Sequence, residues 1–531
     1  MTPSRANLLR GLKLSGIGRV LQLGCGCGVL TRYLGEQGVG VEAVEVSEPE
    51  DAFARLRNAG MKNVEIIHAD YQELTIPKNT YDAVFLIGLL DDIKNYKPVS
   101  ENAEQGIIHL LGEAMASLRE EGILVLAAEN RTGLKYWFGA SEKHHKSPYL
   151  GLYGCPTRDG LQTFDREAWV RIIERSGLQH HRFFYPFPDH FFPKTVLSEE
   201  FVQTDPYAHS LLHRIESKDY LRSWDSAVYE YFIWKDLHRS EKMGEYANSF
   251  LIACGASEDR LKRFTENDFV FFSDSPRRHA YRTLTKKPAG SNTIVKQPLL
   301  SQPDTSMTDS GLSQRLSEKP YCRGRLLSEV WQEAIVIHSK KGPFQDLLKT
   351  YREFIFNFFQ HSKSSEKALD FLPFNIIVED NGNYQIIDDE WVVETPLSPQ
   401  FILFRALMWF GKSSEKLLKR FAEIEQIDNL KGFITYGFNV LSLEGFLNFD
   451  QFIEFEEKLQ ANINFQKGLN NVRRMIDDPW AFWRADPAYP SCRMQLYWAD
   501  HRNGFSENRS VFVWANTGKS RQIFIFPFDV F

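Results

Sequence analysis

The chain has 531 residues, of which 43% are hydrophobic and 25% are charged. This composition is typical of a globular protein, and the length predicts two or three domains. The formal net charge is only −6, from 63 basic and 69 acidic residues, which excludes the strongly basic surface of a nucleic-acid-binding protein. No apolar run approaches the ~18–20 residues of a transmembrane segment, and the first residues lack the apolar core of a secretory signal. We therefore expect a cytoplasmic protein.

Residues 19–34, RVLQLGCGCGVLTRYL, predict a buried strand, a glycine-rich loop and the start of a helix. Glycine at Gly24, Gly26 and Gly28 lets the backbone turn sharply and approach a ligand that a Cβ atom would keep away. Cys25 is a small residue that fills the loop, and the six cysteines form no C-x-x-C pair that would indicate a zinc site. The helix presents unpaired N–H groups to the crevice beyond the strands, where open α/β sheets bind ligands.

Acidic and aromatic residues follow the next strands at the same edge of the expected sheet. Glu45 ends the second strand, where a carboxylate accepts hydrogen bonds from the ribose hydroxyls of a nucleoside. Asp70 and Tyr71 follow the third strand, where they could read an adenine amine and cover its ring, and Gly88 ends the fourth. NAD enzymes share such a loop, but the spacing G-x-G-x-G does not demand the pyrophosphate fit of G-x-G-x-x-G. Another nucleotide or an empty crevice is the alternative.

Strand and helix patterns alternate over the first part of the chain. Strands are expected at 20–24, 40–46, 64–69, 81–88, 122–128 and 179–187, and helices at 28–37, 48–59, 103–120 and 164–177. This alternation predicts an α/β fold with a mainly parallel sheet covered on both faces. With the glycine loop and the acidic strand ends, it resembles a class I S-adenosylmethionine-dependent methyltransferase over residues 1–200. The resemblance implies a Rossmann-like domain that binds S-adenosylmethionine through Gly24, Cys25, Gly26, Gly28, Glu45, Asp70, Tyr71 and Gly88.

Three stretches narrow this resemblance: RANLLR (5–10), ENRTGLKYWFGASEKHH (129–145) and YPFPDH (185–190). They resemble methyltransferase modules of bacterial surface-polysaccharide biosynthesis, such as that of lipopolysaccharide and O-antigen, although Arg131-Thr132, Lys143 and His190 depart from the family's wording. The resemblance implies a glycan or sugar-phosphate acceptor. It also suggests a glycosyltransferase partner, through which the protein would be peripheral to the inner membrane. Residues 135–137, Lys-Tyr-Trp, could hold the acceptor or simply pack against the sheet.

The acceptor decides whether a general base is needed. A hydroxyl acceptor benefits from one, whereas a phosphate oxygen is already anionic at neutral pH. The base candidates near the crevice are Asp91, Asp92 and His144, and His144 is the catalytic residue that we retain.

Two less ordered stretches follow the first domain. Residues 201–262 are aromatic and helical in character and are expected to be a helical connector. Residues 301–320 are polar and aperiodic, which predicts a flexible loop.

A second candidate site lies at residues 370–391, DFLPFNIIVEDNGNYQIIDDEW, where Asp-Asn-Gly indicates a β-hairpin. The D-x-x-P-x-N pattern and the returning I-D resemble the catalytic loop and metal-binding aspartate of aminoglycoside-phosphotransferase-like kinases. The resemblance implies an α+β kinase-like domain over 263–480 that uses ATP and Mg²⁺. Asp370 would orient or deprotonate the acceptor hydroxyl, Asn375 and Asp388 would hold Mg²⁺, and Lys296 would pair with the phosphates.

Several departures leave this kinase assignment open. No glycine-rich loop precedes Lys296, and residues 297–318 offer no amphipathic helix with a partner glutamate. Leu369 replaces the basic or small residue that usually precedes the catalytic aspartate, and DDEW replaces D-F-G. An active kinase, a kinase-like fold with lost or altered activity, and no kinase fold therefore all remain.

The C-terminal residues 481–531 alternate apolar and polar side chains with turn signals, which predicts a β-rich segment. The segment resembles a small β-module found beside bacterial glycosyltransferases, and we expect it to stop partway through that module. Three functions fit the whole chain: a methyltransferase fused to a kinase-like domain, a methyltransferase whose kinase-like region is a scaffold that docks glycosyltransferases, and a nucleotide-binding regulatory protein without catalysis.

Overall fold

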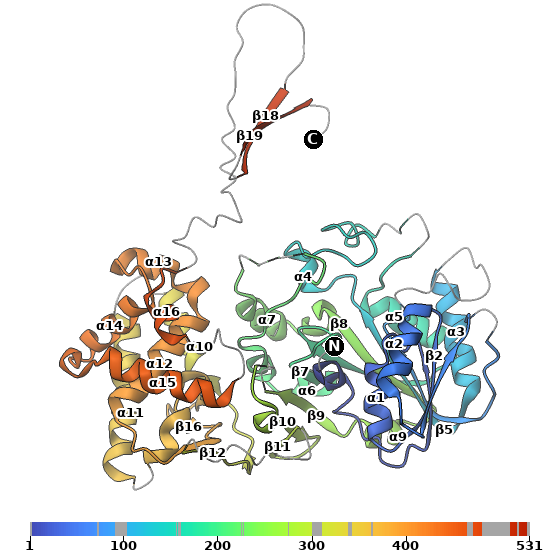
Figure 1. Ribbon diagram of the computed structural model, residues 1–531, viewed down its shortest axis with the longest axis horizontal. Coiled ribbons are helices and arrows are strands. Elements are labelled where there is room, and N and C mark those ends of the chain that lie inside the picture. The colour runs from blue at the N-terminus through green and yellow to red at the C-terminus, as the bar shows by residue number, and fades with distance from the viewer. Residues whose placement is uncertain are drawn as a thin grey trace, which may run out of the picture. The chain divides into compact units, whose positions relative to one another are not determined.

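The computed structural model (Figure 1) divides into two compact units. The first contains Met1–Val330, Phe358–Ser398 and Lys458–Asn470, and the second contains Trp331–Asn357, Pro399–Glu457 and Asn471–Phe531. Residues 1–200 and 201–262 thus share one unit, and residues 263–480 are divided between both. The structure describes residues 3–71, 74–90, 103–154, 157, 161–222, 224, 226, 228–273, 276–299, 311–337, 342–362, 365–464, 471–480, 510–517 and 520–527.

The first unit is built on one sheet of twelve strands in the order β13-β11-β10-β9-β7-β6-β8-β5-β4-β1-β2-β3. Among themselves, strands β1 to β5 pair in parallel. Strand β8 is antiparallel to both of its neighbours, β5 and β6, so β6 runs parallel to β5. The remaining pairs are antiparallel. The bounds are β1 (Arg19–Leu23), β2 (Gly40–Glu45), β3 (Val64–His68), β4 (Tyr81–Ile87), β5 (Leu118–Glu129), β6 (His180–Phe187), β7 (Thr195–Ser198), β8 (Ser249–Gly255), β9 (Asn267–Phe272), β10 (Thr283–Pro288), β11 (Thr293–Pro298) and β13 (Glu318–Pro320).

Helices cover both faces of the sheet (Figure 1). Because successive strand residues point to opposite faces, Leu124 packs with α3 and α5 while Val125 packs with α1, α2 and α9. The expected α/β sheet with two covered faces is therefore confirmed. The helices of this region are η1 (Pro3–Leu8), α1 (Val29–Glu36), α2 (Glu48–Asn58), α3 (Ala103–Ser117), α4 (Leu134–Trp137), α5 (Arg166–Arg175), α6 (Glu199–Thr204), η3 (Ala208–Leu212), α7 (Glu230–Arg239), α8 (Met243–Tyr246), α9 (Glu258–Phe264) and η4 (His279–Tyr281).

Helix α5 shows how local sequence sets the element ends. Asp165 is its N-cap, and the side chain accepts a hydrogen bond from the Ala168 N–H at 3.0 Å. Trp169, Ile172 and Ile173 recur at helical spacing and are buried in the core. These signals lie within one helix, and they were sufficient to place it.

Two sequence expectations are wrong. The sequence predicts a helical connector over residues 201–262, but Ser249–Gly255 within it forms β8 in the middle of the sheet. An unbroken apolar run does not distinguish a buried strand from a buried helix, because periodicity is absent from both. Within the loop expected at 301–320, Leu312–Gln314 and Glu318–Pro320 form β12 and β13, while residues 301–310 lie outside the described residues.

Two small sheets lie beside the candidate kinase-like motif. The hairpin expected around Asp380-Asn381-Gly382 is confirmed, since β15 (Ile376–Val378) pairs antiparallel with β16 (Tyr384–Ile386), and β14 (Arg325–Leu326) joins them. Strands β12 (Leu312–Gln314) and β17 (Trp391–Val393) form the other sheet. Short 3-10 helices, η6 (Ser365–Asp370) and η7 (Pro373–Asn375), carry the motif itself.

The second unit is mainly helical and is described by itself. Its C-terminal β18 (Ser510–Thr517) and β19 (Ser520–Pro527) form an antiparallel hairpin, as the strand pattern predicted, and the other strands expected after residue 491 lie outside the described residues. No helix in the described ranges combines the length and apolar character needed to cross a membrane. The helices that lie wholly or partly in this unit are α10 (Leu327–Ile337), α11 (Gly342–His361), α12 (Pro399–Ser413), α13 (Glu415–Glu425), α14 (Leu430–Val440), η8 (Glu444–Phe446), α15 (Phe449–Ile463) and α16 (Val472–Asp477).

Candidate functional site

The glycine loop between β1 and α1 has the backbone that its sequence requires. Gly24, Gly26 and Gly28 all have positive φ, at 73°, 54° and 72°. A Cβ atom at Gly28 would lie 2.6 Å from Asn58 Nδ2, so this glycine allows α1 and α2 to pack closely. A Cβ at Gly26 would have Glu50 Oε2 as its nearest neighbour at 4.0 Å. Gly26 therefore borders open space, whereas Gly28 is enclosed.

Glu45, at the end of β2, lies directly beneath this loop. Its Oε2 accepts a hydrogen bond from the Gly26 N–H at 2.7 Å, and its Oε1 accepts from the Val46 and Ser47 N–H groups at 3.0 Å. The residue is only 4% exposed, so the carboxylate is fixed in one orientation. The structure thus brings the predicted acid and the predicted loop together.

The other predicted cofactor residues differ in their surroundings. Cys25 is buried, and burial together with the nearby Glu45 carboxylate raises the pKa of its thiol to about 12, as suits a loop filler. Gly88 follows β4 with φ 79°, and no atom of a described residue lies within 4 Å of its Cβ position. Asp70 is exposed after β3, whereas Tyr71 is buried in the core, and burial raises its pKa above the ordinary value.

These residues fit a nucleoside. The two glycines that border open space, Gly26 and Gly88, follow the parallel strands β1 and β4, and the Glu45 carboxylate lies between the loop and β2. Among the described residues, space without side chains lies next to a fixed buried carboxylate, which is what ribose hydroxyls require.

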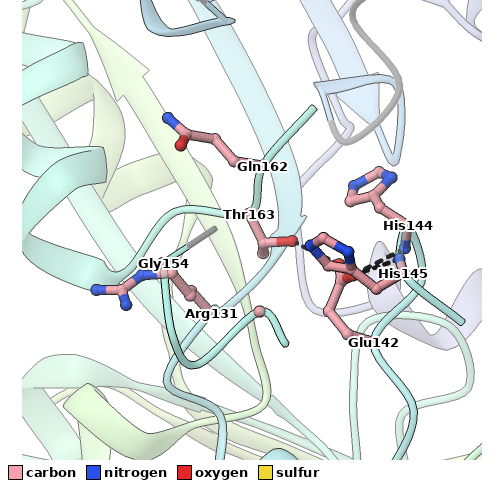
Figure 2. Close-up of a pocket in the computed structure, with 8 residues that line it drawn as sticks. Arg131, Glu142, His144, His145, Gly154, Gln162 and Thr163 are labelled. Carbon is pink, nitrogen blue, oxygen red and sulfur yellow. Dashed lines mark hydrogen bonds between the residues drawn. The ribbon is translucent and has the colours of Figure 1, made fainter. Parts of the chain in front are cut away.

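His144 lines a separate hollow of about 240 Å³, part of it open to solvent. Figure 2 shows Arg131 across this hollow from His144 and His145. Glu142 holds the chain at the two histidines, because its Oε2 accepts hydrogen bonds from the backbone N–H groups of His144 and His145 at 3.0 and 2.8 Å. Its Oε1 accepts a hydrogen bond from the Thr163 hydroxyl at 3.0 Å. The other two base candidates, residues 91 and 92, lie outside the described residues.

The second candidate site brings together residues that are far apart in sequence. Lys296 of β11 donates to both carboxylate oxygens of Asp388, at 2.8 and 2.9 Å, and forms a second ion pair with Glu390 at 2.8 Å. Glu390 also accepts from Arg277 at 2.6 Å and from Gln314 at 3.1 Å. Sequence reasoning found Lys296 and Asp388, but it missed Glu390 and Arg277.

The charges in this cluster support one another. Burial favours the neutral form of Lys296, but the carboxylates of Asp388 and Glu390 outweigh it and raise the pKa of the amine. Burial likewise opposes the ionised form of Asp388, but Lys296, Arg277 and Lys319 lower the pKa of that carboxyl below its ordinary value. Lys296 and Asp388 are therefore ionised at neutral pH.

The remaining kinase-like residues lie near this cluster in sequence but are bound differently. Asp370 is 6% exposed, and its Oδ2 accepts from the Trp391 N–H at 2.9 Å. Asn375 donates through Nδ2 to the Asp370 carbonyl oxygen at 3.1 Å. Over the described parts of the chain, no three His, Cys, Asp or Glu side chains gather in a group that could hold a metal ion. Magnesium at Asn375 and Asp388 stays a prediction.

The sequence analysis also missed a buried polar cluster at the carboxyl edge of β5 and β6, which we call the hub. It contains Glu129, Lys135 and Tyr136, where the Lys135 ammonium lies 3.1 Å from Glu129 Oε1 and the Tyr136 hydroxyl donates to Glu129 Oε2. It also contains Asp189 and His190, both 0% exposed. Two of the quoted motifs gave a signal, because the second contains Glu129, Lys135 and Tyr136 and the third contains Asp189 and His190.

Comparison with known proteins agrees with this geometry. Residues 20–104 match the family described as a methyltransferase domain. A search of curated proteins found no match. Similar solved structures include an S-adenosylmethionine-dependent methyltransferase from Archaeoglobus fulgidus, at 14% identity over 48% of this chain and 92% of that one, with a TM-score of 0.30.

Two further solved structures are of the same kind. One is an S-adenosylmethionine-dependent methyltransferase from Aquifex aeolicus, at 21% identity over 34% of this chain and 84% of that one, with a TM-score of 0.24. The other is phosphoethanolamine N-methyltransferase 1 from Haemonchus contortus with phosphoethanolamine and S-adenosylhomocysteine, at 14% identity over 50% and 46%, with a TM-score of 0.28.

The fold defines a Rossmann-like α/β domain. With the family match, the protein is an enzyme, an S-adenosylmethionine-dependent methyltransferase. The kinase-like identity of the later region is not confirmed.

Proposed function

We propose that this methyltransferase acts on a sugar or sugar phosphate in the biosynthesis of a bacterial surface polysaccharide such as lipopolysaccharide O-antigen. The observation that carries the proposal is that two of the three stretches resembling such modules supply the hub, and the third, RANLLR, is hydrogen-bonded to the backbone beside it. Arg5 donates to the His190 carbonyl oxygen at 2.5 Å, and Asn7 donates to the Pro193 carbonyl oxygen at 3.1 Å. Ser249 of β8 pairs in register with Glu129 and accepts the His190 N–H at 2.7 Å. Segments that form one site explain why they occur together.

The positions of the residues around the crevice suggest how each would bind the cofactor. The loop of Gly24, Cys25, Gly26 and Gly28 and the nearby Gly88 would border S-adenosylmethionine, which supplies a methyl group on a sulfonium sulfur. Glu45 would bind the ribose hydroxyls. Asp70 would bind the adenine amine, and Tyr71 would cover the adenine ring from its buried position. His144 remains a candidate base at its own hollow.

The test is mass spectrometry of the surface glycan from the source organism with and without the gene. Loss of a methyl group from one sugar is the expected result, and an unchanged glycan would refute the acceptor class. Isothermal titration with S-adenosylmethionine checks the cofactor separately. A Glu45→Ala variant that binds S-adenosylmethionine normally would refute the ribose assignment.

Phosphoryl transfer is a second candidate function, supported by the contact between Lys296 and Asp388. In that role Lys296 would pair with ATP phosphates, Asn375 and Asp388 would hold Mg²⁺, and Asp370 would act on the acceptor hydroxyl. Residues 263–480 would then be a kinase-like region with its lysine strand in the large sheet. An inactive region that docks a glycosyltransferase is the alternative, and it would place the protein at the periphery of the inner membrane.

Titration with ATP and Mg²⁺ distinguishes these two possibilities. Wild-type binding that is lost in Lys296→Met and in Asp388→Ala would support the kinase-like site. Lys287→Met is the matched control, because Lys287 is a buried lysine on the neighbouring β10 that pairs with Asp268. Binding that survives both changes, or is lost equally in the control, would refute this site.

A further inference from the structure

The hub contains two buried side chains with unsatisfied polar atoms. Asp189 Oδ1 accepts from the Phe191 N–H at 2.9 Å and from the Tyr220 hydroxyl at 3.2 Å. Among the described residues, nothing donates to Asp189 Oδ2, and neither ring nitrogen of His190 has a hydrogen-bond partner. Buried polar groups are nearly always paired, so these three atoms point to a ligand that pairs with them.

The hub stands at the same edge of the sheet as the cofactor crevice. The Gly88 N–H after β4 donates to the Ala127 carbonyl oxygen at 3.0 Å, and Glu129 follows two residues later in β5. Since β6 runs parallel to β5, its carboxyl end, which leads to Asp189, lies at this edge too. The unpaired atoms therefore belong to the side of the crevice where an acceptor would approach.

Tyr220 covers the hub. Its ring packs against Phe191 and Phe192, with centroids 5.6 and 5.8 Å apart, yet the residue is 47% exposed. The preceding residue, Asp219, fastens this segment to the chain after α4, because its Oδ2 accepts the Ser141 N–H at 2.8 Å. The Tyr220 hydroxyl thus binds Asp189 Oδ1 and, among the described residues, leaves Oδ2 without a donor.

We propose that the hub is the acceptor site, that it takes a sugar with free neighbouring hydroxyls, and that the methylated atom is a hydroxyl oxygen rather than a phosphate oxygen. This inference rests on the proposed function and narrows it. One hydroxyl binds Asp189 Oδ2 and a neighbouring one binds a ring nitrogen of His190, after Tyr220 has moved aside.

The unpaired oxygen of Asp189 favours a hydroxyl. Its Oδ2 needs a hydrogen-bond donor, which a hydroxyl supplies and the dianion of a phosphate monoester does not, and Lys135 is already paired with Glu129. Burial, with Arg5, Lys135 and Lys143, lowers the pKa of His190 far below its ordinary value, so this residue stays neutral and serves as a hydrogen-bond partner. Asp189 is the group left to receive the proton.

The reaction balances with these residues. The acceptor oxygen forms a bond to the methyl carbon while the S–CH₃ bond of the sulfonium breaks, and S-adenosylhomocysteine leaves as a neutral thioether. The hydroxyl proton passes to Asp189 Oδ2. Asp189 returns it to water when Tyr220 moves and the product leaves.

The first experiment identifies the methylated atom. Tritiated S-adenosylmethionine is incubated with the protein and a deproteinised glycan fraction from cells that lack the gene, and the product is treated with cold aqueous hydrofluoric acid, which cleaves phosphate esters but not ethers. The label should remain on the sugar. Release as methanol would overturn this inference and leave the proposed function standing, whereas no labelled product at all, with cofactor binding intact, would overturn both.

The second experiment tests the residues. Asp189→Asn should slow transfer at least ~100-fold, as expected for loss of a general base, with unchanged affinity for S-adenosylmethionine by titration. Asp205→Asn is the matched control, since Asp205 is a buried aspartate that pairs with Arg323 elsewhere in the unit. Transfer by Asp189→Asn at the control rate, or loss of transfer in His144→Asn but not in Asp189→Asn, would overturn the assignment.

The third experiment tests the cover without any acceptor. Diethyl pyrocarbonate modifies accessible neutral histidines, and His190 should be protected in the wild type because it is fully buried. Tyr220→Ala should expose it to modification, measured by peptide mass spectrometry, while Tyr220→Phe should lower the KM for the glycan without changing kcat. Protection that persists in Tyr220→Ala would show that Tyr220 is not the cover.

Discussion

Replacing Gly28 by alanine should lower the free energy of unfolding, whereas replacing Gly26 by alanine should mainly weaken the binding of S-adenosylmethionine. Both residues have positive φ, at 72° and 54°, so an added Cβ strains either of them by about 1–2 kcal/mol. A stiffer unfolded chain offsets about 0.4–1 kcal/mol of that strain. The two positions differ in what the new atom meets.

At Gly28 the Cβ would lie 2.6 Å from Asn58 Nδ2 and 2.9 Å from the Ala54 Cα, which is backbone and cannot rotate away. Overpacking of this kind adds about 1–3 kcal/mol, so the net loss should be about 2–4 kcal/mol. At Gly26 the nearest atom is 4.0 Å away, and the net loss should be about 1 kcal/mol. The new methyl group would instead fill the space beside the proposed ribose.

Gly16→Ala is the matched control, because its φ is 86° and nothing lies within 4 Å of its Cβ position. In urea unfolding, the free energy of unfolding of Gly26→Ala should be close to that of this control, and that of Gly28→Ala should be well below both. Isothermal titration should show at least ~10-fold weaker S-adenosylmethionine binding for Gly26→Ala, about 1.4 kcal/mol. The reasoning fails if Gly26→Ala binds like the control, or if Gly28→Ala unfolds like it.

Glu45→Gln should weaken S-adenosylmethionine binding by ~10-fold in titration, because an amide replaces one carboxylate oxygen that the ribose needs; an unchanged affinity would argue against ribose contact. Cys25 should resist iodoacetamide at pH 8 in the folded protein, since its thiol has a pKa of about 12, and rapid alkylation would contradict its burial. Glu390→Gln should lower the pKa of Lys296, measured by pH-dependent amine labelling, because one of its two carboxylate partners is lost; no change would show that Asp388 alone sets it. The pKa of Asp388 in the folded protein is below its ordinary value, so this carboxylate stabilises the fold at any pH above the ordinary pKa. The stabilisation is lost as the pH falls through the lowered pKa, and Asp388→Asn should therefore flatten the acid limb of a curve of unfolding free energy against pH.

Sequence reasoning succeeded where a feature depends on neighbouring residues. The glycine loop and Glu45 could be placed because strand, turn and helix signals are adjacent there. The alternation of Leu124 and Val125 between the two covered faces likewise follows from the strand pattern alone. Helix α5 was placed for the same reason, through its cap and its apolar spacing.

The failures have a different cause. Strand β8 was missed because its seven residues are all buried and so show no alternation. The hub was missed because Arg5 and the His190 carbonyl oxygen are 185 residues apart, and only the folded chain brings them together. Glu390 was missed because a partner for Lys296 was sought on a helix after β11, whereas the structure supplies it from the chain just before β17.

The residues proposed for phosphoryl transfer and for methyl transfer lie on or beside strands of the same sheet. In the strand order, β11 with Lys296 is second, and β6 and β5, whose carboxyl ends carry the hub, are sixth and eighth, so at least four inter-strand steps separate the two acceptor sites. At about 4.8 Å per step this is roughly 19 Å or more along the sheet, which exceeds the width of a sugar ring. One bound sugar cannot contact both sites. If phosphoryl transfer and methyl transfer both occur, the acceptor must leave one site before it reaches the other, so the two activities act in succession.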